Sequence, residues 1–315
     1  MLDYVREVTK AKGAERGERL QSLWSGYGEI VRVQLEGAKD ESVIVKHVAP
    51  PNVASHPRGW SSERGHARKL RSYEVEAAFY ERYAARCPEG ARVAMPLGIR
   101  SDAGEWLFVL EDLDASGYAR RARDVSDDEL TACLEWLASF HAAFMHESAE
   151  DLWPEGTYWH LATRPDELAS MAPGPLRDAA GAIDARLTDA QHRTLLHGDA
   201  KLANFCFSAD DPVRVAAVDF QYVGGGCGMK DVAYLLSCLS NTRLERHAED
   251  YVDTYFSALR KRLGPDMGAS IEIEWRALYP FAVADFERFL AGWAPSHAKR
   301  VSYAQRLTLT ILQAL

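Results

Sequence analysis

The residues best suited to catalysis lie in two neighbouring segments, Leu195–Phe207 and the apolar segment Val215–Gln221. Asp199 stands five residues before Asn204, and Asp219 follows fifteen residues after that asparagine. Phosphoryl transfer requires a carboxylate that orients the attacking hydroxyl and accepts its proton. It also requires an oxygen ligand and a further carboxylate for the magnesium ion that bridges the phosphates. The spacing provides a candidate for each role: Asp199 as the catalytic carboxylate, and Asn204 and Asp219 as metal ligands.

These side chains need a scaffold, and the first hundred or so residues favour β-strands. Glu29–Gly37 alternates apolar and polar residues, and Glu41–Ala49 is β-branched at its centre. The turn residues Gly37–Asp40 between them predict a β-hairpin. A helix is predicted at Arg68–Ala84, and two further strands are predicted at Arg92–Ile99 and Trp106–Glu111.

Beyond residue 125 the pattern becomes helical. Ser126 and Glu129 form a capping-box signature, because each side chain can bond an otherwise unpaired amide of the first helical turn. Two short strands and three long helices are then predicted, at Thr194–His197, Val213–Phe220, Lys230–Leu239, Glu245–Leu263 and over most of the chain after Glu272. We therefore expect an α+β fold of two lobes: a strand-rich nucleotide-binding lobe, residues 1–112, and a larger helical lobe, residues 113–315.

The ordered motifs resemble those of a known family. His197–Asp199 with Asn204, and the triplet Asp219–Gln221, are similar to the catalytic and metal-binding motifs of aminoglycoside phosphotransferase-like kinases. The similarity is closest to the choline kinase/ecdysteroid kinase-like branch. Protein kinases carry His-Arg-Asp and Asp-Phe-Gly at these places, so Gly198 and Gln221 favour the small-molecule branch. The resemblance implies a protein-kinase-like two-lobed fold and a phosphotransferase that uses ATP and Mg²⁺ to phosphorylate a small-molecule hydroxyl.

The resemblance extends to the expected nucleotide site. Lys46, in the apolar strand Val43–His47, resembles the lysine that contacts the α- and β-phosphates. Glu76 on the next predicted helix resembles its ion-pair partner, with Glu74 as a second candidate.

Two further segments resemble parts that surround the nucleotide. The turn Ser25–Glu29 is similar to a phosphate-covering loop, although it lacks the third glycine of the full motif. Its candidate residues are Gly26, Tyr27 and Gly28. The segment Trp106–Asp114 resembles the hinge, whose backbone groups from Glu111 to Leu113 would hydrogen-bond adenine.

Three residues near Asp199 receive roles from the same resemblance. Lys201 is placed to neutralise charge on the transferring phosphoryl group. His197 belongs to the catalytic motif, where a structural role suits it better than that of a base, because the aspartate does the proton work. Asp231 resembles the aspartate at the start of a helix that braces the catalytic loop.

Other functions have less support from the sequence. A protein kinase is disfavoured because only eleven residues separate Asp219 from Asp231, without an Ala-Pro-Glu motif between them. A metal-dependent phosphohydrolase would need more metal ligands than the sequence offers. A catalytically silent nucleotide-binding scaffold stays open, although such proteins usually lack the catalytic aspartate, the metal aspartate or the strand lysine.

Composition sets broad limits on partners. The chain has 315 residues, 47% of them hydrophobic, and a net charge of −9, so nucleic acid has no broad electrostatic support as a partner. The same charge favours a cationic or neutral acceptor over an anionic one. The charged N-terminus and the lack of an apolar run of roughly 18 residues indicate a cytoplasmic protein without a membrane partner. The five scattered cysteines show no metal-ligand spacing.

The sequence gives limited information about the chemical class of the acceptor. The ecdysteroid-kinase-like pattern favours a bulky alcohol, and Asp285, Glu287 and Arg288 are candidates for the pocket mouth. Several aromatic residues of the helical lobe could line the pocket or belong to the core: Trp153, Tyr158, Trp159, Trp275, Tyr279 and Trp293. The oligomeric state is left open.

Overall fold

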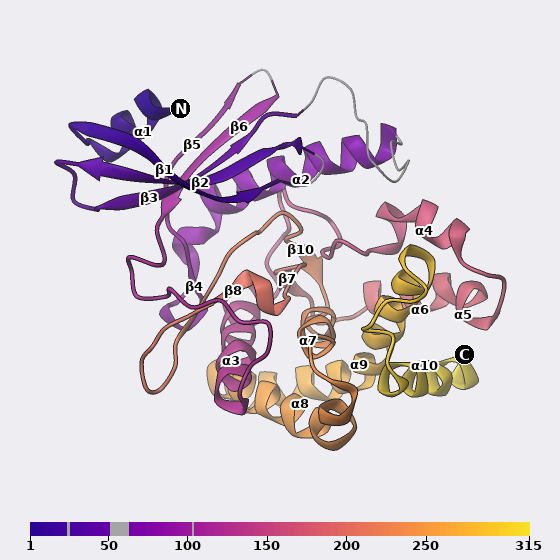
Figure 1. The fold of residues 1–315 in the computed structure, drawn as a ribbon. Helices are drawn as coiled ribbons and strands as arrows, with labels where there is room; N and C mark the ends of the chain where they lie inside the picture. The colour runs from indigo at the N-terminus through magenta and orange to yellow at the C-terminus, as the bar shows by residue number, and fades with distance from the viewer. Residues whose placement is uncertain (24–25, 51–62, 103) are drawn as a thin grey trace.

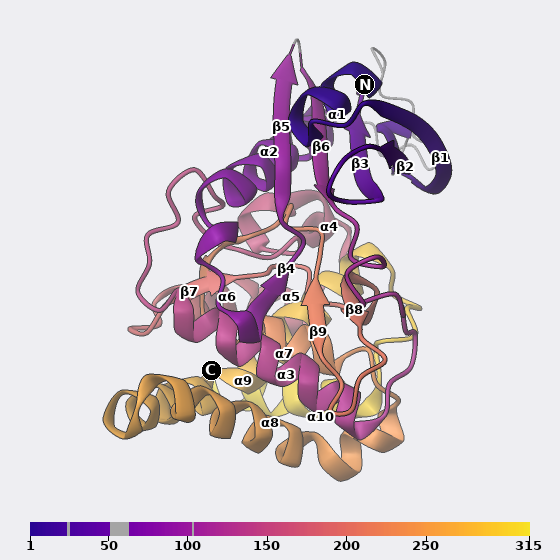
Figure 2. The same ribbon diagram turned by 90° about the vertical axis from the view of Figure 1, so that its left-hand side faces the viewer.

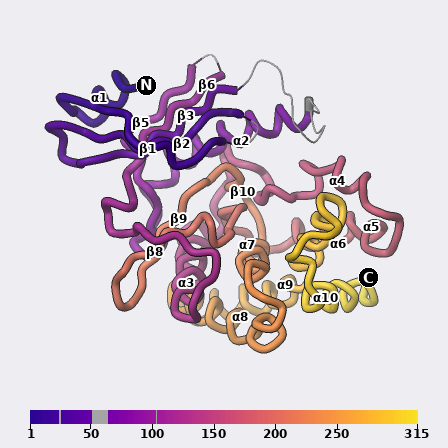
Figure 3. Tube along the Cα trace, in the orientation of Figure 1, coloured from indigo at the N-terminus to yellow at the C-terminus, as the bar shows by residue number. Residues whose placement is uncertain are grey.

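The computed structural model describes residues 1–23, 26–50, 63–102 and 104–315. Figure 1 shows a strand-rich N-terminal region above a larger helical C-terminal region. This arrangement confirms the predicted α+β fold class. The N-terminus lies beside the sheet and the C-terminus lies in the helical region (Figure 3).

The N-terminal region is built on a five-stranded sheet of order β1-β2-β3-β6-β5. Its strands are β1 (Gly13–Ser22), β2 (Gly28–Glu36), β3 (Ser42–Val48), β5 (Pro96–Asp102) and β6 (Glu105–Glu111). The predicted hairpin is confirmed, because β2 and β3 pair antiparallel with Val33 opposite Val43. Strand β1 was not predicted, since eight of its ten residues are exposed and the segment lacks an apolar alternation.

Two helices, α1 (Leu2–Thr9) and α2 (Glu63–Arg82), accompany this sheet. Alternation along β6 directs Leu107 and Val109 into a small apolar cluster with Val5 of α1. Phe108 and Leu110 point to the other face, into the large cluster that contains the apolar residues of α2. Helix α2 therefore lies on the face of the sheet that meets the helical region, as Figure 2 shows.

The C-terminal region is mainly helical. Its helices are α3 (Asp127–Ala143), α4 (Pro165–Ser170), α5 (Pro175–Asp178), α6 (Ala180–Thr188), α7 (Met229–Leu236), α8 (Asn241–Leu263), α9 (Pro265–Trp293) and α10 (Ser302–Ala314). Short strands form two small sheets: β10 (Gly224–Gly226) with β7 (Thr194–Leu196), and β4 (Arg92–Val93) with β9 (Val215–Ala217) and β8 (Phe205–Phe207). Within the described residues, no helix is both long and apolar enough to cross a membrane.

Two predicted strands differ from the structure. The segment predicted as one strand at Arg92–Ile99 is divided, because β4 pairs with β9 in the helical region whereas β5 pairs with β6 in the N-terminal sheet. The chain passes between the two regions at Met95. The strand predicted at Val213–Phe220 is limited to β9, because Asp219 has a φ of 69°, which lies outside the β region.

A shared core joins the two regions. The Phe79 ring of α2 stacks on the Phe220 ring, with centroids 4.0 Å apart. Phe220 directly follows Asp219, so this contact links α2 to the segment that carries the predicted metal ligand. Both phenylalanines are fully buried in one continuous cluster.

The capping box at the start of α3 allows a stability test. Ser126 Oγ accepts a hydrogen bond from Glu129 N at 3.2 Å, and Glu129 Oε2 accepts one from Ser126 N at 2.8 Å. We expect Ser126→Ala to lower the free energy of unfolding by about 1 kcal/mol, measured by denaturant titration. Ser257→Ala, at an exposed position inside α8, should leave it unchanged or raise it slightly, because alanine is the better helix former. Equal effects of the two changes would contradict the capping role.

Candidate active site

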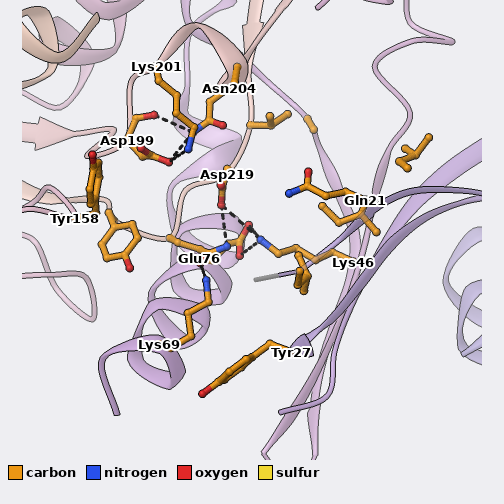
Figure 4. Close-up of a pocket in the computed structure, with 18 of the residues that line it drawn as sticks. Gln21, Tyr27, Lys46, Lys69, Glu76, Tyr158, Asp199, Lys201, Asn204 and Asp219 are labelled. Atoms are coloured by element: carbon orange, nitrogen blue, oxygen red, sulfur yellow. Dashed lines mark hydrogen bonds and ion pairs between the residues drawn. The ribbon is translucent and has the colours of Figure 1, made fainter. Parts of the chain in front are cut away.

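A cleft of about 940 Å³ is lined by residues of both regions. The predicted site residues that line it are Tyr27, Lys46, Glu76, Glu111, Leu113, Asp199, Lys201, Asn204 and Asp219. Figure 4 shows Lys46 and Glu76 facing Asp219, with Asp199, Lys201 and Asn204 grouped beyond it. The structure therefore brings together side chains that are up to 192 positions apart in the sequence, from Tyr27 to Asp219.

Lys46 of β3 and Glu76 of α2 form a buried ion pair. Lys46 Nζ lies 2.8 and 2.6 Å from the two carboxylate oxygens of Glu76. It also lies 3.6 Å from Asp219 Oδ1. Burial alone would lower the pKa of Lys46, but the carboxylates of Glu76 and Asp219 outweigh it and raise that pKa. The second candidate, Glu74, instead pairs with Arg71 at the surface.

The predicted phosphate-covering turn contributes one side chain to the cleft. Tyr27 is buried, and its hydroxyl hydrogen-bonds to His66 Nδ1 of α2. Gly28 does not line the cleft; a Cβ at this residue would lie 2.0 Å from His47 O, so the glycine allows the close approach of β2 to β3. Gly26 has a φ of 74° and open space around it. Ser25 lies outside the described residues.

The predicted hinge is partly engaged within the protein, but the backbone N–H of Leu113 is available. Glu111 N donates to Met95 O at 2.9 Å, and the Glu111 carboxylate accepts a hydrogen bond from Ser116 Oγ at 2.6 Å. Leu113 O accepts from Tyr118 N at 2.8 Å. The Leu113 N–H has no protein acceptor among the described residues. A ligand at this edge could therefore be bound by that backbone group, whereas the Glu111 side chain is engaged within the protein.

Asp231 of α7 braces the loop that carries Asp199. Its carboxylate accepts hydrogen bonds from His197 N at 2.6 Å and from Gly198 N at 3.0 Å. This confirms the predicted bracing role. His197 is fully buried, with Nε2 3.1 Å from Val218 O and Nδ1 accepting from Asp199 N at 3.2 Å. Both ring nitrogens are thus engaged, and burial lowers the pKa of His197, so His197 positions the loop and does not reach the cleft.

Asp199 presents one free carboxylate oxygen. Its Oδ2 accepts hydrogen bonds from Lys201 Nζ at 2.7 Å and from Asn204 Nδ2 at 2.9 Å. Its Oδ1 is buried and has no partner within the described part of the chain. Burial and the nearby Asp219 raise the pKa of Asp199, although Lys201 acts in the opposite direction. An unpartnered carboxylate oxygen of raised basicity is suited to accept a proton from a ligand hydroxyl.

Asp219 has a different electrostatic environment. Its Oδ1 accepts a hydrogen bond from Gln221 Nε2 at 2.8 Å. Burial would raise the pKa of Asp219, but Lys46, Lys201 and Lys69 together lower it. Asp219 therefore stays ionised over a wider pH range than Asp199. Two neighbouring carboxylates whose pKa values are shifted in opposite directions are suited to different tasks.

The donor set fits a magnesium ion that is shared with a ligand. Asn204 Nδ2 donates to Asp199 O and Oδ2, which leaves the Asn204 amide oxygen available. No group of three or more His, Cys, Asp or Glu side chains suited to a metal ion occurs in the described ranges. Mg²⁺ is usually held by one or two carboxylates together with phosphate oxygens and water. The Asn204 amide oxygen and the Asp219 carboxylate match that requirement.

Lys69 lines the cleft and was not predicted as a site residue, and Gln221, which belongs to the predicted metal-binding motif, was given no role of its own. Lys69 Nζ donates to Gln221 Oε1 at 2.9 Å, and the same amide group orients Asp219. Burial lowers the pKa of Lys69 to about 8. The signal in the sequence was the spacing, because Lys69 precedes Glu76 by seven positions and thus lies on the same face of α2.

The candidates for the pocket mouth are wrong. Asp285, Glu287 and Arg288 are almost completely buried and do not line the cleft. Arg288 Nε and Nη2 donate to Asp285 Oδ1 at 3.0 and 2.8 Å, and Glu287 accepts from Arg300 at 2.7 Å. Of the aromatic candidates, Tyr158 and Trp293 line the cleft, whereas Trp159, Trp275 and Tyr279 are buried in the core.

The sequence matches a family model over most of its length. The model of the phosphotransferase enzyme family matches residues 22–265. The chain belongs to this family. Membership of the phosphotransferase enzyme family confirms the predicted resemblance and the predicted class of enzyme, a small-molecule phosphotransferase. A comparison with curated proteins gave no match.

Solved structures of other phosphotransferases are distantly similar to this one. An ethanolamine kinase from Plasmodium vivax is 11% identical with a TM-score of 0.49, over 95% of this chain and 81% of its own. A choline/ethanolamine kinase family protein from Mesorhizobium loti is 14% identical with a TM-score of 0.47, over 99% and 93%. An aminoglycoside phosphotransferase from Streptomyces rimosus, in complex with ADP and streptomycin, is 16% identical with a TM-score of 0.46, over 87% and 96%. Similarities this distant leave the ligands of this phosphotransferase to be argued from its own site.

Gly198 gives a test of how tightly the catalytic loop is packed. It has a φ of 79°, and a Cβ there would lie 1.9 Å from Tyr222 O, whereas Gly117 has a φ of 90° and open space around it. We expect Gly117→Ala to cost only the left-handed backbone strain, about 1–2 kcal/mol of unfolding free energy. Gly198→Ala should cost clearly more and reduce activity, because the clash must displace the loop. Similar losses of melting temperature in the two variants would contradict this account of the loop.

Proposed function

We propose that the protein transfers the γ-phosphate of ATP to a hydroxyl group of a small molecule, with Asp199 as the residue that orients the hydroxyl and accepts its proton. The observation that carries the proposal is the buried, unpartnered Asp199 Oδ1 in the same cleft as the Lys46–Glu76 ion pair and Asp219. In the reaction, the acceptor oxygen forms a bond to the γ-phosphorus, and the bond to the β–γ bridging oxygen breaks. ADP is the leaving group, and the hydroxyl proton moves to Asp199.

The lysines of the cleft provide positive charge for the phosphates. Lys46 is held at a fixed position by Glu76, so its ammonium group is preorganised for the α- and β-phosphates. Lys201 lies on the acceptor side, bonded to Asp199, where it can balance the charge of the transferring group. The backbone N–H of Leu113 would bind adenine at the opposite end of the cleft.

Asn204 and Asp219 would hold the magnesium ion. When bound, this ion neutralises phosphate charge and orients the phosphates for in-line transfer. The low pKa of Asp219 keeps its carboxylate ionised for this task, and Gln221 fixes the orientation of that carboxylate. The separation of tasks follows from the surroundings of the two aspartates, since three lysines act on Asp219 and only one is bonded to Asp199.

Because Asp199 and Asp219 are proposed to have different roles, substitutions at the two positions should cause different defects. Asp199→Asn should abolish phosphate transfer while leaving the affinity for Mg-ATP within about threefold, because the phosphate contacts lie elsewhere. Asp219→Ala should weaken Mg-ATP binding by tenfold or more, because it removes a metal ligand. Isothermal titration calorimetry measures the binding, and release of ADP with a library of hydroxylated compounds measures the transfer. Full activity of Asp199→Asn would overturn the proposal, and binding of Mg-ATP without any transfer would favour the silent scaffold.

Lys69 predicts a pH-dependent step in nucleotide binding. Its pKa of about 8 means that a large share of the side chain is neutral in the free protein above that pH. A bound triphosphate favours the charged form, so Mg-ATP binding near pH ~8.5 should take up a proton, and affinity should fall as the pH rises above about 8. Calorimetry in two buffers of different ionisation enthalpy measures this uptake.

Two variants test whether Lys69 is the group that takes up the proton. Lys69→Met should lose the uptake, whereas Lys39→Met, at an exposed position in the turn between β2 and β3, should retain it. An unchanged uptake in Lys69→Met would show that another group titrates.

A further inference from the structure

The half of the cleft beyond Asp199 has a composition that points to one class of acceptor. We propose that the acceptor is an apolar, ring-containing alcohol that also carries an anionic group, such as a carboxylate. This inference rests on the proposed function, since it names the molecule whose hydroxyl would meet Asp199. It is carried by two features of the described residues: a wall of aromatic rings next to Asp199, and cations along that wall, of which Lys299 and Arg68 have no carboxylate partner within the described part of the chain.

The aromatic wall begins directly at the catalytic loop. Tyr158 N donates to Gly198 O at 3.1 Å, which fixes Tyr158 beside Asp199, as Figure 4 shows. The Tyr158 ring centroid lies 5.5 Å from that of Tyr234 and 5.3 Å from that of Phe289. The Phe289 ring in turn stacks with Trp293 at 5.7 Å. All four rings line the cleft, so a flat apolar body would have contact area along the whole wall.

The first cation of the wall is Lys299. It lies in the segment between α9 and α10 and lines the cleft. Its Nζ contacts Ser237 Oγ at 3.2 Å and Cys238 Sγ at 3.3 Å, both neutral groups. No carboxylate of the described chain lies within 4 Å of this ammonium group. Its charge is therefore available to a ligand.

Arg68 and Arg164 supply positive charge at the other end of the wall. Arg68 Nη1 donates to the neutral carbonyl of Thr163 at 2.8 Å, and no ion pair to a described carboxylate forms at this side chain. Arg164 is paired with the buried Glu167 at 3.1 Å. Burial and the like charge of the nearby Arg164 lower the pKa of Arg68, although Glu167 and Asp166 act in the opposite direction, so the two guanidinium groups repel each other. An anion between them would relieve that repulsion.

The carboxylates of this half do not balance these cations. The acidic side chains that line it are Asp199 and Asp219, and both have tasks in the transfer itself. Of the two nearby carboxylates outside the lining, Glu167 pairs with Arg164 and Asp166 pairs with Arg64, so the charges of Lys299 and Arg68 are not matched by an ion pair among the described residues. The acceptor end of the cleft is therefore locally positive, although the chain as a whole has a net charge of −9.

The same geometry disfavours a cationic acceptor. Aromatic rings can bind an ammonium group through their faces. Here Lys299 Nζ lies over the Tyr234 ring at 4.4 Å, and the Arg164 guanidinium lies over the Tyr158 and Phe289 rings at 5.6 and 5.4 Å. The protein's own cations occupy the positions that such an acceptor would need. The preference for a cationic or neutral acceptor, expected from net charge, does not match this local arrangement.

A matched set of three alcohols tests the inference. The compounds share a naphthalene skeleton with one hydroxymethyl group and differ in the second substituent: 6-(hydroxymethyl)-2-naphthoic acid, its carboxamide, and the corresponding aminomethyl compound. Dissociation constants are measured by calorimetry without nucleotide, so the result does not depend on phosphate transfer. We expect the acid to bind about tenfold more tightly than the amide, and the amine to bind most weakly.

Variants connect the preference to the named cations. Lys299→Met keeps the aliphatic stem over Tyr234 and removes the charge, so it should weaken the acid by about fivefold or more and leave the amide unchanged. Arg68→Met provides an independent second test with the same expectation, and Lys39→Met, in the exposed turn, should change neither value. Equal binding of acid and amide to the wild-type protein, tighter binding of the amine, no binding of the acid, or an unaltered acid-to-amide ratio in both Lys299→Met and Arg68→Met would overturn the inference. Mg-ATP binding measured on the same samples reports separately on the proposed function.

Discussion

The interaction on which the site depends most is the acceptance of two backbone hydrogen bonds by the buried Asp231. By bonding to His197 N and Gly198 N, this carboxylate fixes the peptide that leads into Asp199. A buried carboxylate is costly unless its oxygens are satisfied, so the loop and the start of α7 stabilise each other. His141 completes the arrangement with Nε2 at 3.2 Å from Asp231. The position of the Asp199 carboxylate is thus set by the helical core.

The second half of the site is set by α2, which belongs to the N-terminal sheet but contacts both regions. Glu76 of this helix holds Lys46, Lys69 reaches Gln221, and Phe79 stacks on Phe220. These three side chains contact Lys46, the amide that orients Asp219, and the shared core. A shift of α2 relative to the helical region would therefore move Lys46 and Asp219 apart together. The contact of Phe79 with Phe220 therefore couples the packing of the core to the relative positions of Lys46 and Asp219.

Much of this organisation could be predicted from local sequence. The hairpin follows from alternation and the capping box of α3 from spacing, whereas the pair of Lys46 with Glu76 was implied by the family resemblance; the structure contains each of them. Strand β1 could not be predicted, because its exposed, charged residues leave no pattern, yet its residues Leu20 to Ser22 line the cleft. Asp285 and Arg288 misled the prediction, since a buried ion pair and a pocket mouth both appear as charges within an apolar helix. Only tertiary contacts distinguish the two cases. The roles assigned to the site residues stay predictions until the variants are measured.

The net charge of the sequence likewise does not predict the local charge of the acceptor pocket. A chain with nine excess negative charges can still present a positive acceptor pocket, because interactions at 3–6 Å outweigh charges that lie beyond a screening length of about 8 Å in physiological salt. In this cleft the hinge carboxylates Asp112 and Asp114 pair with Arg32 and Arg121, which also line it, whereas lysines surround the place expected for the phosphates. Arg68, Arg164 and Lys299 then follow beyond Asp199. A nucleotide would neutralise the central lysines but would leave Arg68 and Lys299 without a carboxylate partner among the described residues. Their charge is therefore best explained by the second substrate.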